Sequence, residues 1–527
     1  MKKTIQKLMA ALLAVAMVCA MAIPAFAYHT KEDINKDHSF SAFQIFQGDV
    51  KGTKLSNATW GSHITDHDKF LTDLKADPTL GKLFNEAADV QDVLAVIGTW
   101  HDSDADSIAF ARVVCKYLYP DANTKPTTDI TGDNTLHFDE AGYYLIVDTT
   151  KYNPGDSYVA YNSFMLTVTQ ANWNVTVTPK VEKPSVKKEV FDNNDIGSTG
   201  DNNGWGSSAD HAINEPFQFK LTATLPASDA HVYDYYDKYT VIFDDTLSAG
   251  ITFDNLDTVV ITQNGNNSDI AAEHYKLVKH DESSFSLGID DVKTCVANLN
   301  LNAGATITVT YTAHLNDKAF VNIASGSTEN KNSVQLHYSN NPRDTGSFWG
   351  STPKSAPESE VYVYTYQLNN TKRAENENGA LLKGAGFRLY SDIACNKEQE
   401  IKLKKNTDGT YSRYFGAEDG DEMFSDDKGQ FNVKGLDAGN YYLKETSTPA
   451  DYNPCDVTPV TIKANHTKEN VDLNGSKLST TIINNKAGGI TLPSTGGIGT
   501  TLFYVIGGGL MVAAAVLLIT KKRMENK

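Results

Sequence analysis

The chain has 527 residues and a formal net charge of −18 at pH 7. Binding to nucleic-acid phosphates requires a basic surface, so this charge argues against a nucleic-acid partner. The length allows about three domains. Thr, Asn, Tyr, Val and Gly are abundant, which favours short strands and turns over helices, so we predict a mostly β fold.

The N-terminus has the pattern of a secretory signal peptide. Basic residues precede an apolar run, and residues 25–27 form a small-residue cleavage site. We expect cleavage after Ala27, so that residues 1–27 are removed and the secreted chain begins at Tyr28. The alternative at this end is an uncleaved membrane anchor.

Two proline-containing stretches, residues 179–184 and 342–357, divide the rest of the chain. Elsewhere apolar and polar residues often alternate with the period of a β-strand, and helical periodicity is clearest at residues 89–97 and 106–118. We therefore predict three tandem Ig-like β-sandwich modules that form a rod. Their predicted bounds are 28–180, 181–355 and 356–488.

The first module ends in a predicted strand over residues 173–178. Pro179 ends this strand, because proline cannot donate a hydrogen bond to a sheet. Lys180 follows at the module junction, where its amine can be exposed and mobile. Taken alone, such a lysine is typical of a linker.

The second module begins with a strand pattern that selects one lysine. Val186, Lys188 and Val190 share one face, so we expect Lys188 to point inward.

Two cysteines, Cys395 and Cys455, fall in the third module. Export permits a disulfide between them, and closing this loop would contribute on the order of 4 kcal/mol, so we predict the bridge. The alternative is two buried free thiols. Cys115 and Cys295 lie in separate modules, and we expect them to be free and buried.

The C-terminus has three parts in a fixed order. The first is Leu492-Pro493-Ser494-Thr495-Gly496, the second is an apolar span at 502–519 that is long enough to cross a bilayer, and the third is a basic cytoplasmic tail at 520–527. This order is much more specific than the five-residue motif alone. The alternative is an ordinary single-pass protein with a chance motif.

This C-terminus resembles the cell-wall sorting signal of Gram-positive surface proteins. The resemblance implies that a sortase cysteine attacks the Thr495–Gly496 bond and forms a thioester to Thr495. Residues 173–180 resemble the pilin motif of sortase-assembled backbone pilins, whose core is Val-x-Val-Tyr-Pro-Lys, with Thr178 here in place of tyrosine. In that family the lysine, here Lys180, attacks the thioester of another subunit, which builds a covalent pilus.

Residues 441–446, which read Tyr-Tyr-Leu-Lys-Glu-Thr, resemble the E-box of collagen-adhesin B-type domains and pilins. In those domains the glutamate, here Glu445, promotes an isopeptide bond between a lysine on the first strand and an asparagine on the last. The resemblance implies Lys372 and Asn485, or Asn484 if the register differs by one, because a one-residue slip changes the face.

The second module offers a similar set of three residues. Lys188 is the lysine, Asp245 is the candidate acid, and Asn340 is the candidate partner because residues 338–342 resemble the closing strand of a pilin middle domain. Asn341 and Asn332 are alternatives. For both sets the competing interpretation is three unrelated surface polar residues.

The resemblance predicts a structural backbone subunit, anchored in the wall of a Gram-positive bacterium, that is not an enzyme and needs no cofactor or metal. Expected partners are a pilus-specific class C sortase, other copies of the chain, accessory tip or basal pilins, the housekeeping sortase and peptidoglycan. Host glycans or matrix proteins are candidate ligands. The alternatives are a monomeric wall-anchored adhesin and an anchored enzyme such as a glycosidase. The acidic loop at 418–422 does not match an EF-hand, and we interpret it as a solvated charge run.

Overall fold

The structure is a computed structural model that describes most of the chain between residues 40 and 487 and a few residues near the C-terminus. The described residues are 40–51, 54–98, 100, 105–118, 128–131, 135–148, 164–168, 173–176, 184–192, 204–228, 232–236, 238–321, 330–339, 354–355, 358–468, 471–487, 510–511, 514–519 and 521–522. The chain divides into two compact units: unit 1 is Met1–Thr365 with Asn465–Asp472, and unit 2 is Tyr366–Ala464 with Leu473–Lys527.

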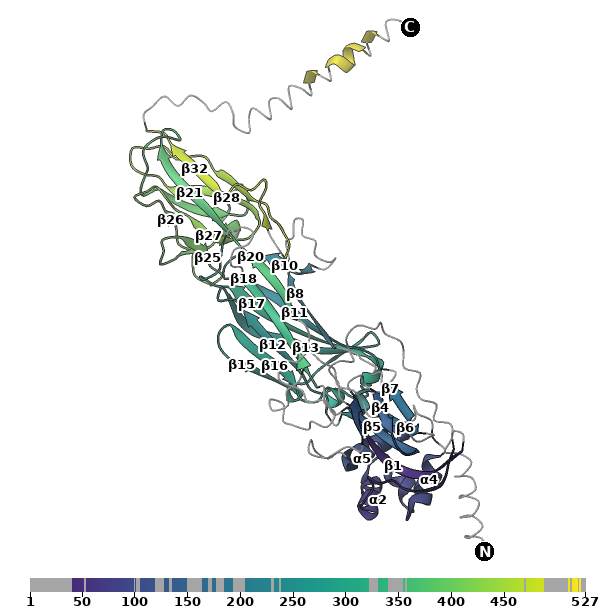
Figure 1. Cartoon of the computed structure of the whole chain (residues 1–527). Helices are drawn as coiled ribbons and strands as arrows, with labels where there is room; N and C mark the ends of the chain where they lie inside the picture. Colours follow the sequence, from purple (N-terminus) through teal and green to yellow (C-terminus); the bar gives the residue numbers. More distant parts are fainter. Residues whose placement is uncertain are drawn as a thin grey trace. The chain divides into compact units, whose positions relative to one another are not determined.

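The N-terminal part of unit 1 is one sheet with helices packed against it (Figure 1). The core contains Phe43 and Phe46 from the sheet and Phe70, Leu94 and Val114 from three helices. The helices have the periodic apolar face that such packing needs. The strands are β1 Phe40–Lys51, β2 Lys54–Trp60, β3 Thr128–Thr131, β4 Thr135–Phe138, β5 Gly142–Asp148, β6 Phe164–Val168 and β7 Trp173–Thr176, and the helices are α2 His67–Ala76, α3 Gly81–Phe84, α4 Val90–Ile97 and α5 Ala105–Leu118.

This part contains helices in addition to the predicted strands. Two of its helices, α4 and α5, match the helical periodicity seen at residues 89–97 and 106–118. Asp89 caps α4 by accepting hydrogen bonds from the backbone amides of Gln91 and Asp92. In the described residues, helices rather than a second sheet cover the apolar face of β1 and β5.

The middle part of unit 1 is a β-sandwich with one shared core. The first sheet has the order β14-β13-β17-β11-β8-β9, and the second has the order β10-β20-β18-β12-β16-β15, with β19 beside β18. The first sheet contains β8 Ser185–Phe191, β9 Trp205–Gly206, β11 Pro216–Leu225, β13 Ile251–Gln263, β14 Asn266–Asp269 and β17 Ala305–Leu315. The second contains β10 Ser208–Asp210, β12 Val241–Leu247, β15 Tyr275–Lys279, β16 Ser284–Ile289, β18 Asn330–Tyr338, β19 Lys354–Ser355 and β20 Ser359–Tyr364.

Alternation of side chains explains these strands. Every second residue of β17 is buried, from Ala305 to Leu315. The hairpin from β13 to β14 turns at Asn264 and Gly265, whose φ angles are 52° and 78°. Two successive positive φ values are the requirement of the tight hairpin turn that Asn-Gly favours.

Unit 2 contains two five-stranded sheets. One has the order β24-β25-β27-β21-β32, and the other has the order β23-β22-β28-β29 with β26 beside β22. The first contains β21 Tyr366–Ala374, β24 Leu403–Lys405, β25 Tyr411–Arg413, β27 Val433–Leu436 and β32 Ser479–Asn484. The second contains β22 Gly386–Tyr390, β23 Glu400–Ile401, β26 Met423–Phe424, β28 Gly439–Ser447 and β29 Thr458–Ile462.

The described structure confirms the mostly β fold and shifts one predicted boundary. Strand β20 pairs with β18, so the middle sandwich continues to Tyr364 and does not stop at residue 355. The short hairpin of β30 Asn465–His466 and β31 Val471–Asp472 also belongs to unit 1. Among its contacts, the Tyr364 hydroxyl donates to the Thr467 carbonyl at 2.9 Å.

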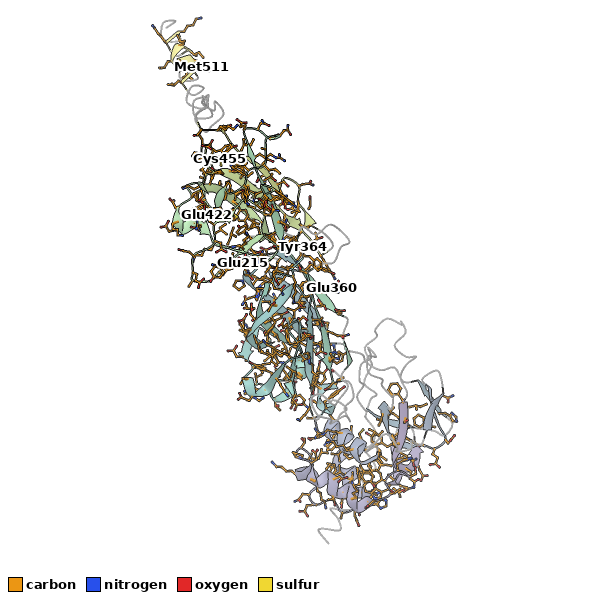
Figure 2. The ribbon with its side chains drawn as sticks, turned by 90° about the vertical axis from the view of Figure 1, so that its left-hand side faces the viewer. Glu215, Glu360, Tyr364, Glu422, Cys455 and Met511 are labelled. Carbon is orange, nitrogen blue, oxygen red and sulfur yellow. The ribbon has the colours of Figure 1, made fainter. Side chains whose placement is uncertain are left out.

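A salt-bridged glutamate also holds this hairpin. Glu360, labelled in Figure 2, pairs with Lys468 at 3.0 Å and with Lys331 at 3.1 Å. The hydrogen bond from Lys468 is the largest cause that lowers the pKa of Glu360, to about 2.

Several predicted features lie outside the described residues: the signal peptide, Pro179 and Lys180, Asn340 and Asn341, and the motif at 492–496. The described part of the apolar span is helical, with exposed apolar side chains such as Leu510 and Leu517. Among the residues that the structure describes, no helix is both long enough and apolar enough to cross a membrane.

Candidate functional site

The middle sandwich buries a lysine beside a carboxyl group, a tyrosine and an asparagine. This middle cluster consists of Lys188 on β8, Asp245 on β12, Tyr311 on β17 and Asn332 on β18. The side chains of Lys188 and Asp245 are fully buried and form an ion pair. Tyr311 joins the other three, because its hydroxyl lies 3.2 Å from Lys188 Nζ, donates to Asp245 Oδ1 at 3.0 Å and accepts from Asn332 Nδ2 at 2.6 Å.

Strand register explains why these side chains meet. Lys188 lies directly opposite Leu221 in the first sheet, and both are buried. In the second sheet, Asp245 is paired with Val334, two residues from Asn332, so all three side chains point to the same face. The two inner faces of the sandwich therefore bring the lysine to the acid and the asparagine.

Burial changes the proton affinities in the middle cluster. It lowers the pKa of Lys188 to about 8, although the Asp245 charge opposes the shift. It also raises the pKa of Asp245, against the opposing effect of Lys188. Both shifts favour transfer of a proton from the ammonium to the carboxylate, which leaves a neutral, nucleophilic amine.

Aromatic rings surround the lysine. Lys188 Nζ lies 5.4 Å from the centre of the Phe219 ring and 5.6 Å from that of Tyr311. Phe285 contacts the Tyr311 ring edge-on at 5.1 Å between ring centres. These rings exclude water, which is the reason that the charged forms are disfavoured.

Unit 2 contains a second set, the C-terminal cluster, with the buried Lys372 on β21, Glu445 on β28 and Asn484 on β32 and the half-buried Cys455 in the loop before β29. Lys372 Nζ donates to Asn484 Oδ1 and lies 3.5 Å from Glu445 Oε1. Asn484 Nδ2 donates to the same Glu445 oxygen at 2.8 Å. The side chains of Lys372 and Glu445 are fully buried.

The other oxygen of Glu445 is also occupied. The Cys455 backbone amide donates to Glu445 Oε2 at 2.9 Å, and the Thr448 hydroxyl donates to it at 3.3 Å. The carboxyl group is therefore oriented with one oxygen toward the asparagine. Glu445 lies on β28 where the alternation of Tyr441, Leu443 and Glu445 predicts an inward side chain, and all three are buried.

The asparagine that contacts Lys372 is not the first choice. Asn485 is exposed, and Asn484 is the buried residue that contacts Lys372. Strand parity is the reason: Asn484 shares a face with Ile482, which lies opposite Lys372 in the parallel pair of β21 and β32. Asn332 occupies the corresponding place in the middle cluster, and Asn340 lies outside the described residues.

The predicted disulfide between Cys395 and Cys455 is wrong, because both thiols are free. Cys455, labelled in Figure 2, has its sulfur 3.5 Å from Lys372 Nζ. Cys395 donates to the carbonyl of Ile393 within its own turn. Each thiol therefore has a separate environment, and Cys115 and Cys295 are buried and form no disulfide, as expected.

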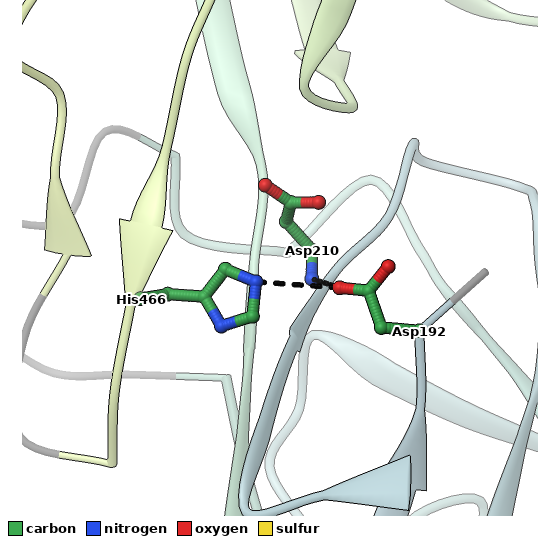
Figure 3. Close-up of side chains that lie close together, drawn as sticks. All are labelled: Asp192, Asp210 and His466. Atoms are coloured by element: carbon green, nitrogen blue, oxygen red, sulfur yellow. Dashed lines mark hydrogen bonds and ion pairs between the residues drawn. The ribbon is translucent and has the colours of Figure 1, made fainter. Parts of the chain in front are cut away.

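A third buried group, outside the two clusters, contains possible metal ligands. His466 Nε2 lies 3.3 Å from Asp192 Oδ2, which also accepts from the Asp210 backbone amide at 3.1 Å (Figure 3). Ser208 Oγ lies 2.9 Å from His466 Nδ1. Two carboxylates and one imidazole within 4.8 Å of one another are donors that a divalent cation would accept, and in the structure the Asp192 carboxylate pairs with the His466 imidazole.

The acidic loop at 418–422 has lysine partners. Lys404 lies 3.3 Å from Asp421 and 3.8 Å from Glu418, and Lys397 lies 3.5 Å from Asp419. These exposed pairs agree with a solvated charge run.

Sequence reasoning missed two members of the clusters. Tyr311 lies in a stretch whose alternation predicts burial, but nothing in the pattern indicates a polar role. For Cys455 the sequence suggested a disulfide or a buried free thiol, and neither indicates a contact with Lys372. Neither residue has a local signal, because each acquires its role from strands far away in the sequence.

Comparisons with known proteins identify two parts of the chain. Residues 368–477 match the family described as SpaA, a prealbumin-like fold domain, and residues 484–526 match the LPXTG cell wall anchor motif. The chain therefore carries a SpaA-type prealbumin-like domain followed by a cell wall anchor, and the predicted location, anchored in the cell wall at the surface, is confirmed. No curated protein sequence matches the chain.

Several solved structures of pilins are similar to parts of the chain. The T6 backbone pilin of Streptococcus pyogenes has 16% identity and a TM-score of 0.47, covering 88% of this chain and 100% of that one. The major pilin SpaD of Corynebacterium diphtheriae has 19% identity and a TM-score of 0.40, covering 66% and 80%. A fragment of the major pilin GBS80 of Streptococcus agalactiae has 20% identity and a TM-score of 0.40, covering 58% and 100%.

Proposed function

We propose that this protein is the structural backbone subunit of a covalently polymerised pilus on the surface of a Gram-positive bacterium. The observation that carries the proposal is the pair of buried clusters, each with a lysine, a carboxyl group and an asparagine; Lys372, Glu445 and Asn484 are in direct contact, and Tyr311 connects Asn332 to Lys188 and Asp245. Such groups are costly to bury unless they are paired or react. Their combination with a cell wall anchor fits a load-bearing surface subunit.

Within each cluster, the proposed reaction joins the lysine to the asparagine. The lysine transfers a proton to the carboxylate, and the neutral Nζ attacks the asparagine side-chain carbon. The bond between that carbon and Nδ2 breaks, Nδ2 leaves as ammonia, and an amide remains. The protonated acid stabilises the developing oxyanion and returns the proton. The proposed bonds are Lys188–Asn332 and Lys372–Asn484.

Between subunits, the proposed reaction is transpeptidation. A sortase forms a thioester at Thr495, and the Lys180 amine of the next subunit displaces the sortase cysteine to form an amide. An ordinary lysine has a pKa of about 10.4, so the amine must lose its proton before it attacks.

Gel analysis of cell-wall extracts tests polymerisation. The wild type should give a ladder of high-mass bands under denaturing conditions. Lys180→Ala should abolish the ladder and leave single anchored subunits, whereas Lys187→Ala, which removes an exposed lysine, should leave the ladder intact. A single wild-type band would contradict the polymer and favour the monomeric adhesin.

Intact mass tests the internal bonds. The secreted wild type should be lighter than its sequence by two ammonia molecules. A mass equal to that of the sequence would overturn both proposed bonds.

A further inference from the structure

The middle cluster contains a hydroxyl group between its acid and its asparagine. In the C-terminal cluster, Glu445 contacts Asn484 directly at 2.8 Å. In the middle cluster, Tyr311 contacts both Asp245, at 3.0 Å, and Asn332, at 2.6 Å. The described contacts thus place the tyrosine hydroxyl where the longer glutamate places its own carboxyl oxygen.

The orientation of the Asn332 amide gives a second clue. As drawn, Nδ2 points to the Tyr311 hydroxyl, and the buried Oδ1 has no hydrogen-bond partner among the described residues. The 2.6 Å separation is short for an N–H···O bond and ordinary for an O–H···O bond. A half-turn of the amide exchanges the two atoms, gives Oδ1 a donor and leaves the separation unchanged.

We propose that Tyr311 is a catalytic residue for the Lys188–Asn332 bond, which donates its hydroxyl proton to the Asn332 carbonyl oxygen and is resupplied by Asp245. This inference rests on the proposed function, because it concerns the same bond.

The proton movements balance. Lys188 first gives one proton to Asp245. The protonated Asp245 donates to the Tyr311 oxygen while Tyr311 donates to Asn332 Oδ1, so the oxyanion forms as a neutral hydroxyl. As the carbonyl re-forms, the proton returns along the same path, and the proton from the attacking Nζ leaves with Nδ2 as ammonia. No other reactant is required.

The environment of Tyr311 suits this role. Its side chain is fully buried, and burial, followed by the nearby Asp245 charge, raises its pKa well above the usual value. The hydroxyl therefore keeps its proton at neutral pH and remains a donor. Its ring is held by Phe219 and Phe253, at 5.3 and 5.4 Å between ring centres.

The test is Tyr311→Phe in the full secreted chain, which keeps the ring and removes only the hydroxyl. The linked peptides of each bond are measured by mass spectrometry at intervals after synthesis. Loss of one proton donor should slow formation of the Lys188–Asn332 bond by about 10²-fold or more. The Lys372–Asn484 bond should form at the wild-type rate, which shows that unit 2 has folded and is reactive.

Tyr338→Phe is the matched control, because Tyr338 is a buried tyrosine of the same sandwich on β18. It should form both bonds at the wild-type rate. If Tyr311→Phe also forms the middle bond at that rate, the relay is wrong while the bond stands. If the wild type lacks the Lys188–Asn332 link, the proposed bond itself is wrong. This outcome can be distinguished from a failure of the relay alone, in which the wild type contains the link.

If a proton donor has been lost, folded Tyr311→Phe protein should first accumulate without the Lys188–Asn332 bond and then form this bond slowly. If raising the pH from 6 to 8 restores the wild-type rate to this variant, deprotonation of Lys188 alone limits the reaction and the relay is overturned; a persistent deficit across that range supports it.

Discussion

The two clusters place similar groups in different architectures. In unit 2, Lys372 and Asn484 lie on neighbouring parallel strands of one sheet, and Glu445 comes from the other sheet. In the middle sandwich, Asp245 and Asn332 share a sheet, and Lys188 comes from the facing one. The comparison teaches that different strands can bring a lysine, a carboxyl group and an asparagine together in a dry space, which is what the proposed bonds require.

This difference has a mechanical consequence under the proposed bonds. A Lys372–Asn484 bond would tie the first strand of unit 2 to its last strand within one sheet. A Lys188–Asn332 bond would join the two sheets of the middle sandwich. In each case a pulling force would pass through the bond and bypass the chain between the linked residues, but β20, which follows Asn332, would remain in the path of the force.

The largest expected effect comes from removing one acid. Glu445→Gln should eliminate the Lys372–Asn484 bond and leave the middle bond intact. Opening a loop of this length should lower the free energy of unfolding of unit 2 by about 5 kcal/mol. Intact mass and thermal unfolding would measure both effects, and Glu422→Gln is a control on a nearby carboxyl outside the cluster. A Glu445→Gln protein that still loses two ammonia molecules would contradict the role of the acid.

The choice of asparagine gives an all-or-none test. Asn484→Ala should prevent the bond in unit 2, and Asn485→Ala should not, because only Asn484 lies on the buried face. Asn332→Ala should likewise prevent the middle bond while Asn340→Ala leaves it. Peptide mapping would identify the linked residues. Loss of a bond in Asn485→Ala or Asn340→Ala would reverse the assignment.

The stability of an unlinked middle sandwich should depend on pH. In Asn332→Ala, Lys188 keeps a folded-state pKa of about 8, below the value near 10.4 in the unfolded chain. Between these values the unfolded state binds more protons, so the free energy of unfolding should rise with pH, by on the order of 3 kcal/mol over the full window. Urea unfolding at pH 8 and pH 10 would measure the rise.

The control for this pH effect lacks both partners. Adding Lys188→Met and Asp245→Asn to Asn332→Ala removes the buried titrating pair, so the rise should disappear. If the free energy of unfolding of this triple variant rises equally with pH, the effect comes from other titrating groups.

The smallest expected effect concerns the thiols. Burial raises the pKa of Cys455 to about 11, so in the folded protein at pH 7 it should react slowly with thiol reagents. Without any reductant, unfolding should make both Cys395 and Cys455 fully reactive. A peptide pair linked by a disulfide between Cys395 and Cys455 would restore the original prediction.

Cys455→Ser should leave the rate of bond formation in unit 2 within about twofold, since the Cys455 backbone amide, which contacts Glu445, remains.

Much of the site could be predicted locally. Alternation along its strand predicts the inward Lys188, the resemblance of residues 441–446 to the E-box implies Glu445 and Lys372, and Asp245 is the candidate acid; all four are buried. The asparagines were harder to predict from the sequence, because each lies near a strand end, where a register shift of one residue moves the side chain to the other face of the sheet. The helices that cover the N-terminal sheet were visible as periodic segments, but whether a second sheet was also present depended on long-range pairing.

The sequence by itself determined the mostly β character, the inward lysines, the acids and the C-terminal anchor, because these depend on side-chain period or on a contiguous motif. Only the tertiary structure decided that Asn484 contacts Lys372, that Cys395 and Cys455 stay apart, and that Tyr311 lies between Asp245 and Asn332. These facts depend on strand register and on the packing of one sheet against another. Residues far apart in the chain meet there, and no local pattern specifies the distance between them.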